Sequence, residues 1–229
     1  MRFRRAPIVG AGPGLSAALT RRFVREGIAV VLAARRTDKL AALCAECGAT
    51  AIACDAGDPA QVASLFAQLD AAGAPDLVVY NASGRVSGPI ADLDPAEVER
   101  SLRVSAFGAF LVAQQAARRM LPAGHGAIAL TGATAGVKGF ALSAPFAMGK
   151  FALRGLAQSL ARELAPKGIH VVHVVIDGGI RADHRPDAAD APDGTLDPDA
   201  IAGTYWHLLT QHRSAWTWEI EVRPWVERF

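Results

Sequence analysis

The stretch Pro7–Leu19, PIVGAGPGLSAAL, places a glycine-rich turn between an apolar run and an amphipathic run. This order predicts a strand, a tight turn and then a helix. Gly10, Gly12 and Gly14 allow the turn backbone angles that a Cβ would resist. Backbone N–H groups from these glycines to Leu15 would then lie at the positive end of the helix, where a pyrophosphate binds. The stretch therefore indicates a dinucleotide-binding turn, with an ordinary tight turn as the alternative.

Apolar runs alternate with amphipathic runs from this turn to the end of the chain. We expect strands at Pro7–Gly10, Ala29–Ala33, Thr50–Cys54, Leu77–Tyr80, Gly126–Thr131, His170–Ile176 and Trp218–Val222. We expect helices at Leu15–Arg25, Thr37–Cys47, Pro59–Ala71, Pro95–Met120, Ser143–Pro166 and Asp199–Gln211. Strands that alternate with helices of this length form βαβ units with right-handed crossovers. The expected fold is a single α/β domain over residues 1–229, with a doubly wound, mostly parallel, seven-stranded sheet and helices on both faces.

The composition agrees with one α/β domain. The chain has 229 residues, of which 51% are hydrophobic, and a net charge of +2. The charges are scattered, which argues against nucleic acid or a membrane surface as a partner. The chain has neither a signal-peptide pattern nor a run of about 20 apolar residues, so we expect a cytoplasmic protein.

Cys44, Cys47 and Cys54 lie close together, and the first two form a C-x-x-C pair. A structural zinc site needs about four ligands, and no second Cys or His pair stands at a suitable spacing. A redox pair is expected at the start of a helix, whereas this pair closes a helical stretch. We therefore expect no metal site and interpret the cysteines as small packing residues.

The end of the second expected strand indicates which dinucleotide would bind. An NAD-type site usually carries an acidic side chain there, which binds the ribose 2′-OH. The sequence VVLAARR instead has Ala33 and Ala34, followed by Arg35 and Arg36. A guanidinium group favours a 2′-phosphate. NADP(H) is therefore expected rather than NAD(H), unless both arginines simply face solvent.

The segment 181–198, RADHRPDAADAPDGTLDP, is acidic, rich in proline and nearly free of large apolar residues. It cannot add much to a core, so a surface loop is expected. The segment follows the carboxyl end of a strand, where open α/β sheets bind ligands. We interpret it as a mobile substrate lid, with a plain disordered loop as the alternative.

Motifs along nearly the whole chain resemble those of the short-chain dehydrogenase/reductase family, in the same order. GAGPGLS resembles the family's G-x-x-x-G-x-G turn, with Ser16 at the last glycine. CDAGD resembles the acidic motif after the third strand, YNAS the N-N-A-G motif, and VVIDGGI the stretch after the sixth strand. The resemblance implies a Rossmann fold that binds a nicotinamide dinucleotide. It also implies further cofactor-binding residues: Asp55 beside the adenine, Asn81 and Ala82, and Gly178 and Ile180 beside the nicotinamide.

The family's chemistry rests on a Tyr-x-x-x-Lys pair, in which the lysine lowers the pKa of the tyrosine and holds the nicotinamide ribose. The matching stretch here is FAMGK, with Phe146 at the tyrosine position and Lys150 at the lysine position. The family's serine falls on Ala133 and its asparagine on Ser105. Lys150 alone is kept of these four. The resemblance therefore supports the cofactor site and weakens the catalytic site.

A phenylalanine ring has no proton to transfer, and losing positioned proton transfer costs about 10²–10⁴ in rate. Three interpretations follow. The protein is an oxidoreductase for a small carbonyl or alcohol compound that uses another proton donor, or it binds NADP(H) without turnover as a sensor or partner subunit, or it is a structural member of an oligomer with active relatives. The candidate donors are Thr134, Ser143, Lys150, a water molecule and His184.

The C-terminal stretch 212–229, HRSAWTWEIEVRPWVERF, contains three of the four tryptophans. Alternation over Trp218–Val222 predicts an edge strand, and an apolar edge is a candidate subunit contact. Similar proteins of the family form dimers or tetramers through such strands and through two long helices, here at 103–120 and 146–164. We expect a homo-oligomer. We also expect a small, mostly apolar substrate, in a pocket lined by 86–89, 137–143 and the lid.

Overall fold

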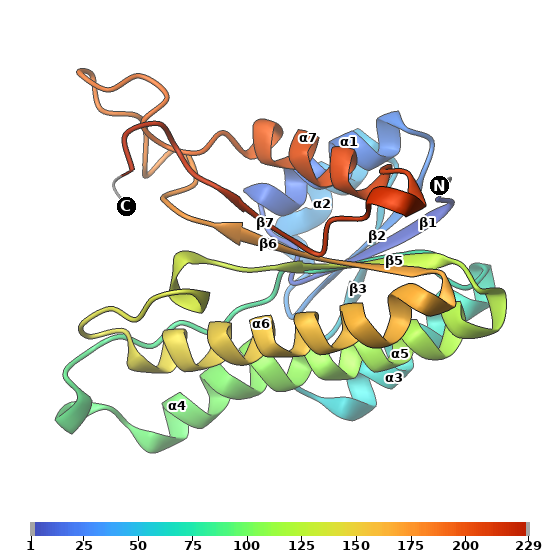
Figure 1. Ribbon diagram of the computed structural model, residues 1–229, viewed down its shortest axis with the longest axis horizontal. Helices are drawn as coiled ribbons and strands as arrows, with labels where there is room; N and C mark the ends of the chain where they lie inside the picture. The colour runs from blue at the N-terminus through green and yellow to red at the C-terminus, as the bar shows by residue number, and fades with distance from the viewer. Residues whose placement is uncertain (1–2, 228–229) are drawn as a thin grey trace.

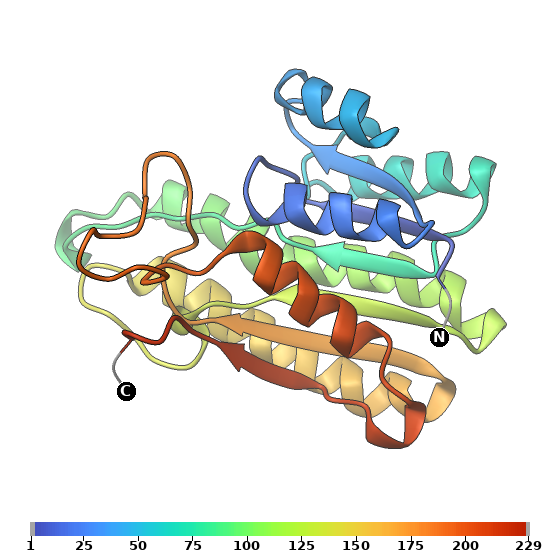
Figure 2. The same cartoon turned by 90° about the horizontal axis from the view of Figure 1, so that it is seen from above.

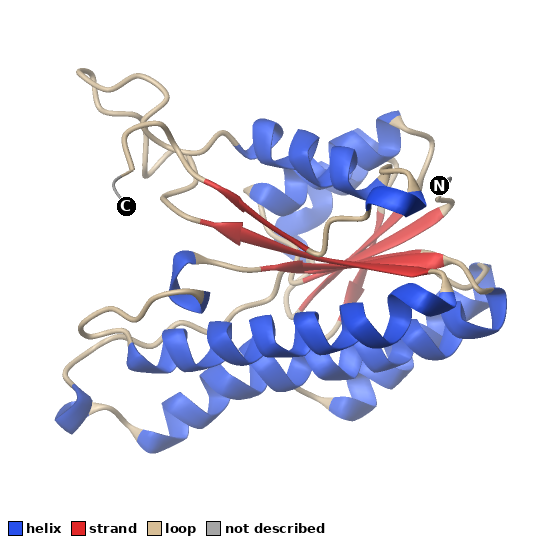
Figure 3. Ribbon diagram, in the orientation of Figure 1, coloured by secondary structure: helices blue, strands red, loops and turns tan. Residues whose placement is uncertain are grey.

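The computed structural model describes residues 3–227 and contains one seven-stranded sheet in which every pair of neighbouring strands is parallel (Figures 1 and 3). The strand order is β3-β2-β1-β4-β5-β6-β7. The strands are β1 (Arg5–Val9), β2 (Ala29–Ala34), β3 (Thr50–Ala53), β4 (Leu77–Tyr80), β5 (Gly126–Thr131), β6 (Ile169–Ile176) and β7 (Glu219–Val222). The expected doubly wound α/β fold is confirmed, and the sheet is wholly rather than mostly parallel.

Helices cover both faces of this sheet. Figure 1 shows α1, α2 and α7 on one face and α3, α4, α5 and α6 on the other. The α-helices are α1 (Leu15–Arg25), α2 (Ala41–Cys47), α3 (Pro59–Ala72), α4 (Pro95–Leu102), α5 (Gly108–Ala123), α6 (Ala144–Leu164) and α7 (Pro198–Leu209). Strands β4, β5 and β6 are buried along their whole length, which explains why they read as continuous apolar runs. Among the described residues, no helix is both long and apolar enough to cross a membrane.

The helix expected over Pro95–Met120 is interrupted. Residues Arg103–Phe107 form a π-helical segment between α4 and α5. Such a segment widens one turn of a helix and is frequent at functional sites. The apolar pattern runs through the segment without a break, so the sequence alone did not predict the interruption. Ser105, at the family's asparagine position, lies in the middle of it.

The parallel register brings the carboxyl ends of the central strands to one edge of the sheet. Val9 pairs with Ala33 of β2 on one side and with Tyr80 of β4 on the other. The chain moves outward from β1 in opposite directions on its two sides, so β1 and β4 flank the point at which the strand order reverses. Open α/β sheets bind their ligands in the crevice at such a point.

Residues 181–197 form a long loop at this same edge, drawn in orange in Figure 2, and Pro198 begins α7. The loop is closed at its base, where the backbone N–H groups of Arg181 and Leu196 donate to the carbonyl oxygens of Leu196 and Gly179. The Arg181 guanidinium forms ion pairs with three loop carboxylates, those of Asp187, Asp193 and Asp197. The role of the segment 181–198 as a substrate lid stays a prediction.

Strand β7 lies at one edge of the sheet, as expected, and pairs with β6. Glu219 attaches it to the neighbouring elements. Its carboxylate accepts hydrogen bonds of 2.8 and 2.7 Å from Arg154 of α6 and lies 2.9 Å from Nδ1 of the buried His173 of β6. The C-terminal strand is therefore held by side chains as well as by its backbone ladder.

Candidate nucleotide site and active site

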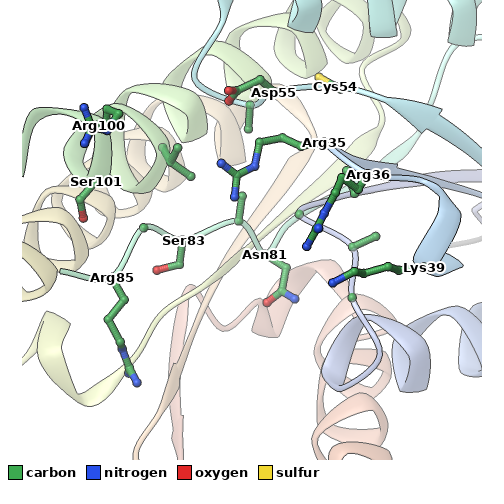
Figure 4. A pocket seen from close by; sticks show the side chains of 18 of the residues that line it. Arg35, Arg36, Lys39, Cys54, Asp55, Asn81, Ser83, Arg85, Arg100 and Ser101 are labelled. Atoms are coloured by element: carbon green, nitrogen blue, oxygen red, sulfur yellow. The ribbon is translucent and has the colours of Figure 1, made fainter. Parts of the chain in front are cut away.

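An open cavity of about 790 Å³ lies at the carboxyl edge of the sheet. Its walls come from five parts of the chain: the glycine-rich turn, the end of β2, the segment after β3, the loop after β4, and α4 with the residues that follow it (Figure 4). Of the sequence-derived candidates, the following line it: Gly10, Gly12, Arg35, Arg36, Asp55, Asn81 and Ala82. The fold thus brings together seven residues from four separate segments of the sequence.

The glycines of the turn have different structural roles. Gly10 has a φ of +87°, and a Cβ at this position would lie 2.2 Å from the backbone nitrogen of Ala82. Gly10 is therefore required by the close approach of the turn to β4. A Cβ on Gly12 or Gly14 would meet no atom within 4 Å. The protein itself leaves this side of the turn open, as a turn that receives a phosphate group must.

Ser16 stands where the family has a third glycine, and it stabilises the turn. Its buried hydroxyl donates to the carbonyl oxygen of Gly10 over 3.3 Å and accepts a 2.7 Å bond from Nδ2 of Asn81. The side chain therefore connects the first turn of α1 to the ends of β1 and β4. The sequence marked Ser16 only as a departure from the glycine pattern.

Three cations line the end of the cavity next to β2. Arg35 and Arg36 follow β2, and Lys39 lies one short turn later; all three are exposed and line the cavity (Figure 4). Within residues 3–227, none of the three has a hydrogen-bond or ion-pair partner. Cations without a partner at this place favour a phosphate group, because the phosphate would form ion pairs with them.

Asp55 and Tyr80 occupy family motifs but make local contacts. Oδ1 of Asp55 accepts a 2.9 Å hydrogen bond from the backbone of Gly57 and so shapes the segment after β3. Tyr80 is fully buried, and its hydroxyl donates to the carbonyl oxygen of Val104. Burial raises the pKa of this phenol, so it stays protonated. Tyr80 therefore joins β4 to the π-helical segment.

Lys150 is 3% exposed, and its ammonium group donates a 2.8 Å hydrogen bond to the carbonyl oxygen of Thr131. Burial and, to a smaller extent, the positive charge of Arg85 together lower the pKa of Lys150 from 10.5 to about 8. No carboxylate contributes to this shift. The amine is therefore a buried cation that can lose its proton near neutral pH.

Two cations lie close to the ring of Phe146. The guanidinium carbon of Arg85 is 4.4 Å from the centre of its ring, and Nζ of Lys150 is 5.9 Å from it. An aromatic face attracts cations at such distances. The ring cannot transfer a proton. The charged groups beside it, which can form ion pairs and hydrogen bonds, are Arg85 and Lys150.

The other two substituted positions are also placed by the structure. Ala133 has extended backbone angles just after β5 and carries no polar side chain. The Ser105 hydroxyl is buried, accepts a 2.9 Å bond from the backbone nitrogen of Gly84 and lies 3.3 Å from its carbonyl oxygen. Ser105 therefore holds the loop after β4. A Cβ on Gly149 would lie 2.7 Å from the Ser105 side chain, so α6 packs directly against this position.

The remaining candidates lie outside the walls of this cavity. Gly14 precedes α1 as its N-cap residue and Leu15 is buried in the core. Gly178 and Ile180 follow β6, beside the base of the 181–198 loop. Among the candidate proton donors, the Thr134 hydroxyl lies 3.4 Å from the carbonyl oxygen of Ile176, and His184 is exposed in the loop.

Sequence reasoning missed three cations that line the cavity. Lys39, Arg85 and Arg100 are exposed there, and Arg100 lies 3.6 Å from the carboxylate of Glu97. Lys39 could have been found as a third cation after the second strand. Arg85 belongs to an irregular loop whose path no periodic pattern predicts, so its position beside Phe146 required the structure.

Metal ligands were not expected, and the described part of the chain contains no group of three or more His, Cys, Asp or Glu side chains placed to hold a metal. The three cysteines are free. Cys44 and Cys47 pack against the core beside α1, and Cys54 is buried. Burial raises the pKa of the Cys54 thiol to about 11, which leaves it unreactive at neutral pH.

Comparison with known proteins agrees with the fold and its strand order. The short chain dehydrogenase family profile matches residues 4–192. The chain belongs to this family. A short-chain dehydrogenase from Rhodopseudomonas palustris is 35% identical and superposes with a TM-score of 0.84, over 97% of this chain and 99% of that one. The fold and the family are therefore shown by both sequence and structure.

Two other similar proteins have known nucleotide ligands. A metagenomic short-chain oxidoreductase, solved in complex with NADP, is 30% identical with a TM-score of 0.84, over 96% of this chain and 97% of that one. The cyclic-di-GMP-binding biofilm dispersal mediator protein of Escherichia coli is 34% identical over 181 residues, which is 78% of this chain and 74% of the relative. This chain is thus similar both to an oxidoreductase and to a cyclic-di-GMP-binding protein.

Proposed function

We propose that this short-chain dehydrogenase binds NADP(H) at the carboxyl edge of its sheet and acts as an oxidoreductase on a small carbonyl or alcohol compound. The observation that carries the cofactor assignment is a group of three cations after β2 that have no ion-pair partner among residues 3–227: Arg35, Arg36 and Lys39. No carboxylate stands at the end of β2, where an NAD-type site would hold the ribose 2′-OH. The 2′-phosphate of NADP(H) would lie against these cations.

The glycine-rich turn would hold the pyrophosphate. Gly12 and Gly14 leave open space on the ligand side, and the N-terminus of α1 points its backbone N–H groups toward it. Asn81 and Ala82 would border the adjoining ribose, since both line the same cavity. When bound, NADP(H) supplies or accepts the hydride, and the protein residues have to orient the substrate and manage the proton.

The catalytic site departs from the family's pattern, because Phe146 and Ala133 replace its tyrosine and serine and Ser105 replaces its asparagine. Lys150 is the one titratable side chain retained, and its pKa of about 8 allows it to exchange a proton near neutral pH. We propose Lys150 as the proton-transferring group, acting directly or through a water molecule. Thr134 and His184 are weaker candidates, since Thr134 donates to the carbonyl oxygen of Ile176 and His184 lies in the exposed loop. Ser143, which precedes α6, stays a candidate.

Turnover is tested by following NADPH consumption with aldehydes, ketones and the reverse alcohol reactions. We expect slow turnover by the natural protein, and its loss in Lys150→Met. The double substitution Phe146→Tyr with Ala133→Ser should raise the rate by about 10²-fold or more, because it restores positioned proton transfer. Binding of NADPH with no consumption by either protein would contradict the enzymatic proposal.

A second candidate function is nucleotide binding without turnover. It is favoured by the absence of the tyrosine and serine hydroxyls, and by the name of the cyclic-di-GMP-binding relative from Escherichia coli. The cations Arg35, Arg36 and Arg85 could receive the phosphates of a cyclic dinucleotide as well as those of NADP(H). Competition titrations of bound NADPH with cyclic-di-GMP separate the two: displacement at micromolar concentrations favours the regulator, and none favours the oxidoreductase.

We also propose that the protein forms a homo-oligomer. Four large apolar side chains on the outer helices are exposed: Phe107, Phe110, Met148 and Phe151. Exposed apolar groups of this size are typical of subunit contacts. A mass of one chain by light scattering would contradict the proposal. Cytoplasmic location and the lid role of 181–198 also stay proposals.

A further inference from the structure

The cavity has a second positively charged end, away from the one assigned to the 2′-phosphate. Arg85 lies in the loop after β4, and Figure 4 shows it separated from Arg36 and Lys39 by Asn81 and Ser83. Its side chain is exposed and lines the cavity. Within residues 3–227, Arg85 has no ion pair and no hydrogen bond; its recorded contact is with the Phe146 ring, 4.4 Å away.

Arg85 and Lys150 approach the same aromatic ring and repel each other. The ammonium of Lys150 is buried and donates to the carbonyl of Thr131, with no carboxylate beside it. Arg85 is exposed, but its positive charge still lowers the pKa of the buried Lys150, and a bound anion would relieve this repulsion. Among the described residues, no carboxylate forms an ion pair with Arg85 or Lys150. The opposite charge would therefore have to come from a bound anion.

We propose that Arg85, held on the Phe146 ring and assisted by the positive field of Lys150, binds an oxyanion of the substrate, a carboxylate or a phosphate. The planar guanidinium fork matches either group with two parallel hydrogen bonds. The Phe146 ring acts as a platform that fixes the plane of the fork. In this account Phe146 has a function of its own at the position where the family has tyrosine.

The inference rests on the proposed function in one respect: the anion belongs to a substrate that lies beside the nicotinamide end of the cofactor. This conclusion narrows the substrate class from the expected small apolar compound to a small compound that carries a negative charge. The phosphates of the cofactor are assigned to the turn and to Arg35 and Arg36, so they do not account for Arg85.

The test is a calorimetric titration of the NADP⁺-saturated protein with matched pairs that differ in charge. One pair is 2-oxobutanoate and its methyl ester; the other is dihydroxyacetone phosphate and dihydroxyacetone. We expect one or both anions to bind at least about 10-fold more tightly than their neutral partners, since the charged hydrogen bonds are lost in the latter. The pair with the larger difference identifies carboxylate or phosphate.

Three variants assign the effect to Arg85. Arg85→Gln should weaken anion binding about 10-fold or more, Arg85→Lys should restore part of it, and both should leave the affinity for NADP⁺ within about 2-fold. Arg213→Gln is the matched control, because Arg213 also stacks on an aromatic ring, 5.9 Å from the centre of Trp216, and lies outside the cavity. It should bind the anion as the natural protein does.

The proposal is overturned if each neutral partner binds as tightly as its anion, or if Arg85→Gln has no effect. It is also overturned if the anion displaces NADP⁺, since it then binds in the nucleotide site. If NADP⁺ itself does not bind, the proposed function fails, and the same titrations on the nucleotide-free protein decide the anion site separately. Circular dichroism spectra of all variants establish that each is folded.

Discussion

The ammonium group of Lys150 lies 2.8 Å from the carbonyl oxygen of Thr131 and 5.9 Å from the centre of the Phe146 ring, in a side chain that is 3% exposed. This bond connects α6 to the end of β5, next to the substituted position Ala133. The lysine is thereby held at the carboxyl edge of the sheet without help from a tyrosine. In the proposed mechanism this lysine exchanges the proton, although the tyrosine that the family uses is missing.

Lys150 should make the stability of the protein depend on pH in the alkaline range. Its pKa is about 8 in the folded protein and 10.5 in the unfolded chain, so between these values the unfolded state binds more protons and folding becomes more favourable as pH rises. From pH 7 to 9.5, we expect the natural protein to gain about 2 kcal/mol relative to Lys150→Met. Urea unfolding of both proteins at the two pH values measures this difference, and an unchanged difference would contradict the assigned pKa.

Gly10 should be far less replaceable than Gly12. Gly10→Ala forces a Cβ against the backbone of Ala82 and requires a positive φ, so we expect a loss of about 3 kcal/mol or more in the free energy of unfolding. Gly12→Ala meets no atom within 4 Å and should cost less than about 1 kcal/mol while still weakening nucleotide binding. Urea midpoints and NADPH titrations compare the two. Equal loss of stability in both variants would refute this division of roles.

Ser16→Ala should loosen the nucleotide-binding turn. The change leaves Nδ2 of Asn81 without its acceptor and should cost about 1–2 kcal/mol. Ser64→Ala is the control, since the Ser64 hydroxyl is on the exposed face of α3 and accepts a 3.4 Å bond from Gln68. Thermal unfolding of both variants tests the prediction. If they were equally stable, the Ser16–Asn81 bond would have no structural value.

Much of the fold could be predicted from the sequence because its signals are local and periodic. The turn at Gly10 was recognisable from glycine spacing, and the buried strands Leu77–Tyr80 and Gly126–Thr131 from continuous apolar runs. The π-helical segment Arg103–Phe107 was missed, because it depends on tertiary contacts. Tyr80 donates to the Val104 carbonyl and Ser105 bonds to Gly84, and neither contact leaves a periodic trace in the sequence.

The candidate site was predicted in part for a related reason. Arg35 and Arg36 directly follow a strand, so their place at the edge of the sheet could be inferred. Arg85 lies in an irregular loop, and its contact with Phe146 joins two segments 61 residues apart (146 minus 85). Such a contact follows from how the loop and α6 pack and not from any local pattern.

The most direct test of the account is a fluorescence titration of the natural protein with NADPH and with NADH, repeated on Arg35→Gln/Arg36→Gln and on the control Arg213→Gln. We predict that NADPH binds at least about 10-fold more tightly than NADH, and that the double variant loses this preference while its affinity for NADH changes less than about 2-fold. The control should behave as the natural protein. Equal affinity for the two nucleotides, or equal loss of both in the double variant, would contradict the assignment of an NADP(H) site.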